Sequence, residues 1–393
     1  MTIPPQSSAS QPLEDAAWEV ARAARDRAAE RDETGAFPDM EFQALHARGL
    51  LSAPLPRDLG GLGIGSEPGT MHTLLRVLSV LGWGNLSLAR LYEGHVNALL
   101  LVTTFGTSEQ RRQTAVDASQ GEIFAVWNTE AADGVSLESA GGGRYTLRGS
   151  KSFASGAGSV TRPLVTGRLP DGGWQMILPR LGDADRQRID TSWWHPLGMH
   201  ASASHRLDLQ NLEVGPKELL GAPGDYYRQP WFSGGAIRFA AAQLGGAASL
   251  LDAAVSGLRQ AGRTDDALQQ ARLGEAAVAV ASGEQWLAWA AKRADVSALG
   301  GTQDPHVSNE EMVAAANMTR TAIERVCLHV LDLVERSVGA RGLLRPHPIE
   351  RIGRDLTLYL RQPAPDAAIR DAGRFALERE TPSLTWWQWD PTP

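Results

Sequence analysis

The sequence predicts an α+β protein in three parts: an N-terminal helical domain, a middle antiparallel β domain and a C-terminal helical bundle. Apolar residues recur at helical spacing before about residue 120 and again after about residue 233. Between these regions, short apolar segments are separated by Gly and Asp, as in a sheet of short strands. The 393 residues, 42% of them hydrophobic, are enough for more than one large core.

The first part begins with a Pro/Ser/Gln-rich segment, residues 1–12, which we expect to be disordered. The helical domain is expected at residues 13–120. Helical patterns run over residues 16–30, 71–80 and 86–102. The last of these is nearly apolar throughout, which predicts a buried helix.

The β domain is expected at residues 121–224. Residues 121–128, 144–148 and 163–168 have the length and composition of strands. Residues 205–214 alternate between polar and apolar side chains, which predicts one half-buried strand.

The helical bundle is expected at residues 225–382, followed by a Trp-rich tail at residues 383–393. Cys327, the single cysteine, lies on an apolar stripe of helical spacing, so we interpret it as a small core residue. Three tryptophans in four residues of the tail would be costly in water, so the tail is expected to pack on its own subunit or on a neighbour.

Charge and hydropathy exclude several classes of protein. A net charge of −7 argues against a general nucleic-acid binder. The longest uncharged apolar stretch, 239–251, is too short to cross a bilayer. The N-terminus lacks the regions of a signal peptide, so the sequence indicates a cytoplasmic protein. Asp183, Asp185 and Asp190 are interpreted as a solvated loop, and no metal site is predicted.

Four stretches in this order and spacing resemble the acyl-CoA dehydrogenase superfamily: residues 31–65, 125–158, 197–221 and 338–356. The resemblance covers almost the whole chain, and it implies the same order of helices, strands and helices. It also implies a flavin, usually FAD, bound between the β domain and the C-terminal bundle.

The resemblance assigns several residues to the flavin. Thr129, before Glu130, matches the Thr that faces the pyrimidine end of the ring, and Trp127 lies in the same motif. Phe153 and Ser155 match an aromatic residue and a hydroxyl near N5. A flavin needs hydrogen-bond partners along its edge and apolar cover on its faces, and these residue types supply both.

Two further cofactor motifs depart from the family pattern. Arg263 matches an Arg that contacts the pyrophosphate of a neighbouring subunit's FAD, but Thr264 follows it in place of Phe-Gly. Gly339 and Gly342 match a Gly-rich turn on the adenosine side, with Arg341 between them. The cofactor predicted is therefore FAD, with FMN as the alternative.

The catalytic Glu of most acyl-CoA dehydrogenases has no counterpart here. The two positions where the family places it are Ile237 and Pro363, and neither side chain takes a proton. Asp366 is the nearest carboxylate and could act as a relocated base, since the nitroalkane oxidases of the superfamily use an Asp. The alternative is that Asp366 is a helix N-cap.

Flavin monooxygenases of the same superfamily also lack the Glu, and they use reduced flavin with oxygen. The Phe153–Gly156 segment resembles theirs. Some carry a His near the flavin, and His95 is at a comparable place, where an imidazole could donate a hydrogen bond to an oxygen species. The alternative is a His satisfied within a buried helix. Ser204 and His205 lie on a segment that could also approach the ring.

The sequence therefore predicts a flavin-dependent oxidoreductase with two enzymatic alternatives. One is dehydrogenation of an acyl thioester, with an electron-transfer flavoprotein as electron acceptor. The other is oxygenation of a small molecule by flavin from a flavin reductase. A third alternative is a flavin- or acyl-binding protein without activity. The resemblance implies a homodimer or homotetramer.

Overall fold

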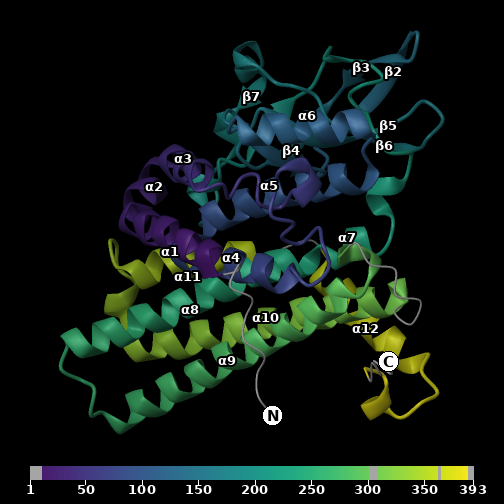
Figure 1. Cartoon of the computed structure of the whole chain (residues 1–393). Coiled ribbons are helices and arrows are strands. Elements are labelled where there is room, and N and C mark those ends of the chain that lie inside the picture. The colour runs from purple at the N-terminus through teal and green to yellow at the C-terminus, as the bar shows by residue number, and fades with distance from the viewer. Residues whose placement is uncertain (1–10, 301–307, 362–363, 388–393) are drawn as a thin grey trace.

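The computed structural model describes residues 11–300, 308–361 and 364–387, and it confirms the predicted order of helices, strands and helices (Figure 1). The β-rich part lies at the top of Figure 1, and the long helices of the C-terminal bundle lie at the bottom. The N-terminal helices are α1 (Gln11–Asp26), α2 (Ala28–Thr34), α3 (Asp39–Ala47), α4 (Met71–Gly84), α5 (Leu86–Phe105) and α6 (Ser108–Ser119). The C-terminal helices are α7 (Trp231–Gly234), α8 (Ala236–Gln260), α9 (Ala267–Asp295), α10 (Asn309–Val338), α11 (Pro348–Tyr359) and α12 (Pro365–Leu377).

Helices α4 and α8 approach each other so closely that both need glycine at the contact. A Cβ on Gly82 would lie 2.1 Å from the Ala242 carbonyl oxygen, and a Cβ on Gly245 would lie 2.0 Å from the Ser79 carbonyl oxygen. One continuous apolar core therefore runs from the N-terminal helices into the bundle.

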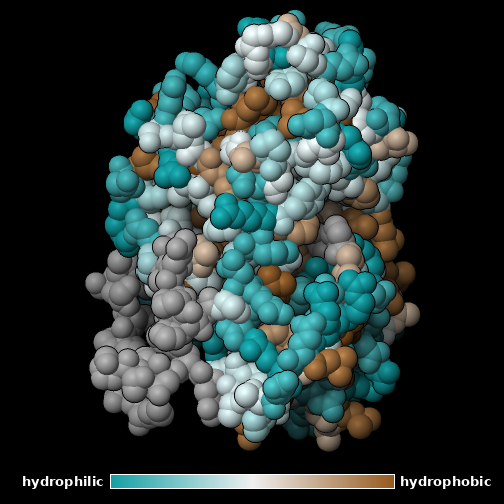
Figure 2. Space-filling view, turned by 90° about the vertical axis from the view of Figure 1, so that its right-hand side faces the viewer, coloured by the Kyte–Doolittle hydropathy of each residue, from teal (hydrophilic) through white to brown (hydrophobic). Residues whose placement is uncertain are grey.

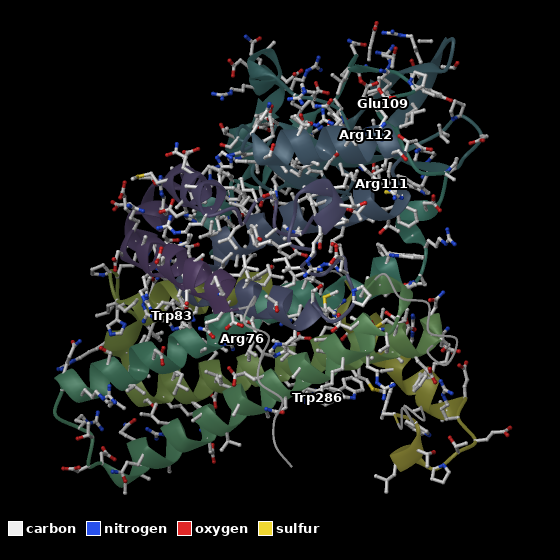
Figure 3. The ribbon with its side chains drawn as sticks, in the orientation of Figure 1. Arg76, Trp83, Glu109, Arg111, Arg112 and Trp286 are labelled. Carbon is white, nitrogen blue, oxygen red and sulfur yellow. The ribbon has the colours of Figure 1, made fainter. Side chains whose placement is uncertain are left out.

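Polar contacts add to this packing on the outer side of α4. Arg76 Nη1 lies 3.2 Å from Glu284 Oε1 on α9. Trp83 Nε1 donates to Asp252 Oδ2 on α8 at 2.7 Å. Figure 3 shows both side chains beside the bundle helices. The two helical parts are thereby joined by apolar and polar contacts.

The β domain consists of two sheets. The larger has the strand order β10-β6-β5-β2-β3-β9, with β1 paired to β5, and the smaller has the order β4-β8-β7. Most pairings are antiparallel as predicted, but β1 and β2 each pair with β5 in parallel, because other strands intervene along the chain. The strands are β1 (Phe124–Trp127), β2 (Ser136–Gly141), β3 (Arg144–Arg148), β4 (Ser150–Ala154), β5 (Arg162–Arg168), β6 (Trp174–Ile177), β7 (Ile189–Asp190), β8 (His205–Asp208), β9 (Glu213–Val214) and β10 (Leu219–Leu220).

The single strand predicted for residues 205–214 is wrong. The segment forms two short strands, β8 and β9, in different sheets, with a turn between them. Asn211 has a φ of +63°, a left-handed conformation that Asn tolerates and that ends the extended run. The alternation in sequence continues through the turn because both strands have one buried face.

Among the described residues, one stretch, Trp231–Gln260, which includes α8, is long and apolar enough to cross a membrane, and 67% of its most apolar 18-residue window is buried inside the protein. Helix α8 is therefore the core helix of the bundle.

Figure 2 shows hydrophobic residues in separate groups on one face of the molecule, among many hydrophilic residues.

Cys327 and the C-terminal tail behave as predicted where the structure describes them. Cys327 is fully buried, and burial raises the pKa of its thiol, as for a core residue. Trp387 stacks on Phe375, with ring centroids 5.3 Å apart, and meets Trp289 edge-on at 5.0 Å. The described part of the tail thus packs on its own chain, while Trp389 lies outside the described residues.

Candidate active site

A cavity of about 670 Å³ lies where the β domain, α5 and the C-terminal bundle meet. Its volume is in the range of small-molecule sites. The β domain supplies one wall, while α5, α7, the start of α8 and parts of α10, α11 and α12 supply the rest. The side chains that line it include Arg90, Glu93, Asn97, Leu101, Thr129, Phe153, Ser155, Met199, Ser202, Ser204, Trp231, Phe232, Arg238, Phe239, Arg320 and Asp371.

Phe153 is held in an unusual backbone conformation on the β wall. Its φ is +51°, and the register of β4 against β8 shifts between Lys151 and Ala154. This irregularity turns the ring toward the cavity, where it is 49% exposed and meets Trp193 edge-on. A bulky residue with positive φ is strained, and such strain gathers at ligand sites.

Ser155 is fixed by contacts on two sides. Its hydroxyl lies 2.9 Å from the Ser204 hydroxyl, which lies 2.8 Å from the Ser202 hydroxyl. Trp127 is buried behind the wall, and its Nε1 donates to the Ser155 carbonyl oxygen at 2.9 Å. Trp127 therefore positions Ser155 and does not itself line the cavity.

Thr129 follows β1 and exposes its side chain to the cavity. The buried ammonium group of Lys151 holds this segment, since it donates to the Asn128 carbonyl oxygen at 3.1 Å and pairs with Glu130. Burial lowers the pKa of Lys151, and Glu130 opposes that shift. The two residues beside Thr129 are thus tied to the strand that carries Phe153.

The loop behind the serines is tied to α11. The Asp355 carboxylate accepts from the Met199 N–H at 2.5 Å, and Met199 has a φ of +61°. Burial raises the pKa of Asp355 to about 6. Arg354 pairs with Asp32 at 2.6 Å and donates to the Leu197 carbonyl oxygen at 2.9 Å. The β wall is therefore fixed against both helical parts.

The wall opposite the β domain carries a buried polar network. Glu93 on α5 accepts from Arg90 Nη1 at 2.6 Å and from Asn97 Nδ2 at 2.5 Å, so both of its carboxylate oxygens are occupied. Asn97 Oδ1 accepts from Arg238 Nε on α8 at 2.5 Å. Sequence reasoning missed this network. Polar side chains at positions 90, 93 and 97 of a nearly apolar helix share one face, and that spacing was the available signal.

The structure places His95 as in the alternative of a His satisfied within a buried helix, and its catalytic role stays a prediction. The ring is fully buried between α5 and β1, outside the cavity lining. Nε2 lies 2.8 Å from the Leu51 carbonyl oxygen, and Nδ1 accepts from the Phe124 N–H at 3.1 Å. Burial lowers its pKa to about 4, so the imidazole is neutral. Neither nitrogen is available to an oxygen species at a flavin.

The expected positions of a catalytic carboxylate are also without one. Ile237 is fully buried and does not line the cavity, whereas Pro363 lies outside the described residues. Asp366 is exposed in the first turn of α12 and does not line the cavity, and the N-cap of that helix is Ala364 rather than Asp366. Asp371 lines the cavity but pairs with Arg370 at 2.9 Å.

Arg263, Gly339 and Gly342 lie far from the cavity of their own chain. The 25 residues of α8, at 1.5 Å each, put ~37 Å between the cavity wall and the turn that holds Arg263. Gly339 and Gly342 follow the end of α10. Arg272, near the start of α9, donates to the Arg336 carbonyl oxygen, so this end of α10 lies near the same turn as Arg263. A role toward a neighbouring subunit's cofactor stays a prediction.

Of the other candidates, Ser204 belongs to the serine chain on the cavity wall, whereas His205 does not line the cavity. Across residues 11–300, 308–361 and 364–387, no cluster of three or more His, Cys, Asp or Glu side chains is placed to hold a metal ion.

Comparison with known proteins identifies the family of this chain. Residues 9–122 match the family "Acyl-CoA dehydrogenase, N-terminal domain", and residues 237–360 match "Acyl-CoA dehydrogenase, C-terminal domain". The chain is 27% identical to the dibenzothiophene monooxygenase of Rhodococcus qingshengii over 91% of each chain. It is 26% identical to a putative acyl-CoA dehydrogenase, YdbM, of Bacillus subtilis (strain 168), over 87% of this chain and 90% of the other.

The same fold is present in a solved relative. The FMN-bound crystal structure of TdsC, the dibenzothiophene monooxygenase of Paenibacillus sp. A11-2, superposes with a TM-score of 0.82 at 23% identity. The match covers 96% of this chain and 100% of that one.

Proposed function

We propose a function from one premise: the chain belongs to the acyl-CoA dehydrogenase family. It is a flavin-dependent oxidoreductase, and we propose that it is the oxygenase component of a two-component flavin monooxygenase. A separate flavin reductase supplies the reduced flavin, and the substrate is a small organic molecule rather than an acyl thioester.

The observation that carries this proposal is the state of the carboxylates around the cavity. Removal of an α-proton needs a carboxylate that can reach the substrate and accept a proton. Both oxygens of Glu93 accept hydrogen bonds from Arg90 and Asn97, and Asp371 is paired with Arg370. Of the two carboxylates in the described cavity lining, Glu93 has both oxygens occupied and Asp371 has its Oδ1 paired with Arg370, which supports oxygenation over dehydrogenation.

The β wall fits a flavin ring. Phe153 gives apolar cover, while the hydroxyls of Thr129 and Ser155 provide hydrogen-bond partners for the ring edge. The strained backbone at Phe153 and Met199 is what a preformed ligand site predicts. When bound in reduced form, a flavin supplies the two electrons that put one oxygen atom of O₂ into the substrate and the other into water.

We propose FMN as this flavin rather than FAD. Arg263, the residue that the family uses on the pyrophosphate of FAD, pairs with its neighbour Asp266 at 2.7 Å instead. The other departures in sequence lie in the turn at Gly339, on the adenosine side of the family's cofactor. FMN needs neither contact within the pocket.

The chain's own residues then have separate tasks. Trp127 and Ser204 hold Ser155 in place, and Lys151 holds the segment that carries Thr129. Aromatic residues at the starts of α7 and α8 exclude water from the cavity.

Labelled oxygen gas tests the proposal. The protein is supplied with FMN, a flavin reductase and NADH, and a panel of aromatic substrates is analysed by mass spectrometry. We expect one labelled oxygen atom in a product, with a smaller yield for Ser155→Ala at limiting FMN. Oxygen consumption that gives only hydrogen peroxide across the panel would argue against the proposal. In a parallel anaerobic arm, flavin reduction by an acyl-CoA would instead favour a dehydrogenase, whose partner would be an electron-transfer flavoprotein.

A further inference from the structure

Arg238 is a buried cation in the cavity wall without a carboxylate partner. It lies in the first turn of α8, is 5% exposed and lines the cavity. Its Nε donates to Asn97, whereas its Nη1 is buried and has no hydrogen-bond partner in the described part of the chain. No described carboxylate lies within ion-pair distance of it. Burial lowers the pKa of Arg238 to about 10, so the guanidinium stays charged at neutral pH.

Glu93, the nearby carboxylate, does not neutralise Arg238 directly. Its two oxygens are taken by Arg90 and Asn97, and the Asn97 amide stands between Glu93 and Arg238. Asn97 therefore orients the guanidinium, and Glu93 acts on it through space rather than by a direct ion pair. An unpaired buried charge is strongly unfavourable in a folded protein unless something else satisfies it.

The surroundings of Arg238 add to its attraction for an anion. Ala236 and Gly235, at the amino end of the 25-residue helix α8, also line the cavity, and this end of a helix carries partial positive charge. Arg320 on α10 lines the same cavity and lies over the Phe239 ring at 5.0 Å. The neighbouring side chains Leu101, Trp231 and Phe232 are apolar. Arg238 thus lies beside apolar side chains, and Arg320 adds a second cation to the same cavity lining.

We propose that Arg238 binds an anionic oxygen group of the substrate, so that the substrate is an apolar, aromatic-sized molecule with one carboxylate or phenolate. The proposal rests on the function proposed above and names its substrate class. The anion compensates the buried guanidinium, and the apolar body fills the chamber between α5 and α8. Uncharged heteroaromatic molecules are accordingly poorer ligands.

Binding of matched probes tests the proposal without any turnover. Isothermal titration calorimetry compares naphthalene-2-carboxylate with the isosteric, uncharged naphthalene-2-carboxamide, and 2-naphthol titrated over pH tests a phenolate. A charge-assisted contact to a buried Arg predicts that the carboxylate binds roughly 10- to 100-fold more tightly than the carboxamide. Arg238→Met should abolish that preference and Arg238→Lys should keep part of it. The control Arg374→Met removes an exposed cation of α12 outside the cavity and should keep all of it.

Equal affinities for the two naphthalene probes in the parent protein would overturn the proposal, even if Arg238→Met failed to fold. Persistence of the preference in a folded Arg238→Met variant would overturn it as well. A preference that depends on Arg238, in a protein that never oxygenates any substrate, would support the anion site while refuting the proposed monooxygenase activity.

Discussion

His95 should make the protein sensitive to acid, and the size of the effect follows from its burial. The folded-state pKa is about 4, below the 6.5 of a free imidazole, because the ring is desolvated. A lowered pKa gives stability that is present above pH 6.5 and is lost as the pH falls toward 4, since the unfolded chain takes up the proton first. Between about pH 7.5 and about pH 4.5, this linkage removes roughly 2.5 kcal/mol from the free energy of unfolding.

His95→Gln isolates that contribution. Glutamine offers one donor for the Leu51 carbonyl oxygen and one acceptor for the Phe124 N–H, and it does not titrate. Urea unfolding at the two pH values should show that the variant loses about 2.5 kcal/mol less than the parent between them. FMN affinity and the coupling of oxygen use to product should be unchanged, because the ring lies outside the cavity. A variant with the parental acid loss, or one that diverts oxygen to hydrogen peroxide, would refute the structural role.

Three other changes have expected outcomes. Trp127→Phe removes the hydrogen bond to the Ser155 carbonyl oxygen and should weaken FMN binding by about 2- to 13-fold, measured by fluorescence titration. An unchanged FMN affinity would contradict the positioning role of Trp127. Phe153→Gly and Phe153→Ala should both reduce the affinity for FMN. In urea unfolding, the Gly variant should be more stable than the Ala variant by about 1 kcal/mol, because the φ of +51° strains any residue with a Cβ. An Ala variant more stable than the Gly variant would contradict that strain. Trp387→Ala removes the contacts to Phe375 and Trp289 and should cost at least about 1 kcal/mol, seen as a lower melting temperature; an unchanged melting temperature would show that the tail does not stabilise the fold.

The sequence predicts the helices well because their apolar spacing is also their packing pattern. Cys327 and its neighbours form a stripe that is buried as expected, and the polar α5 positions are the exception that marks the cavity. The strand predicted at residues 205–214 is too long, because alternation of polar and apolar residues indicates burial on one face and not which strands pair by hydrogen bonds. The alternation pattern does not reveal the turn at Asn211.

Motif resemblance predicts cavity-lining residues on the β wall but none of the polar network on the opposite wall. Thr129, Phe153 and Ser155 do line one cavity, because the local strand and its bulge set their direction. For His95 the sequence leaves two alternatives open, because a residue of α5 can face either the core or the cavity. Which of the two it faces depends on tertiary partners such as the Leu51 carbonyl, far away in sequence.

The absence of a catalytic base for acyl-CoA dehydrogenation is tested most directly by anaerobic mixing of the FMN-loaded protein with straight-chain and branched acyl-CoAs. Flavin absorbance is followed in a stopped-flow instrument. The account predicts that the oxidised flavin spectrum persists, since a missing base costs roughly 10²- to 10⁴-fold in rate. Rapid bleaching by an acyl-CoA, abolished by Asp371→Asn or Asp366→Asn, would contradict the account and identify the protein as a dehydrogenase with a relocated base.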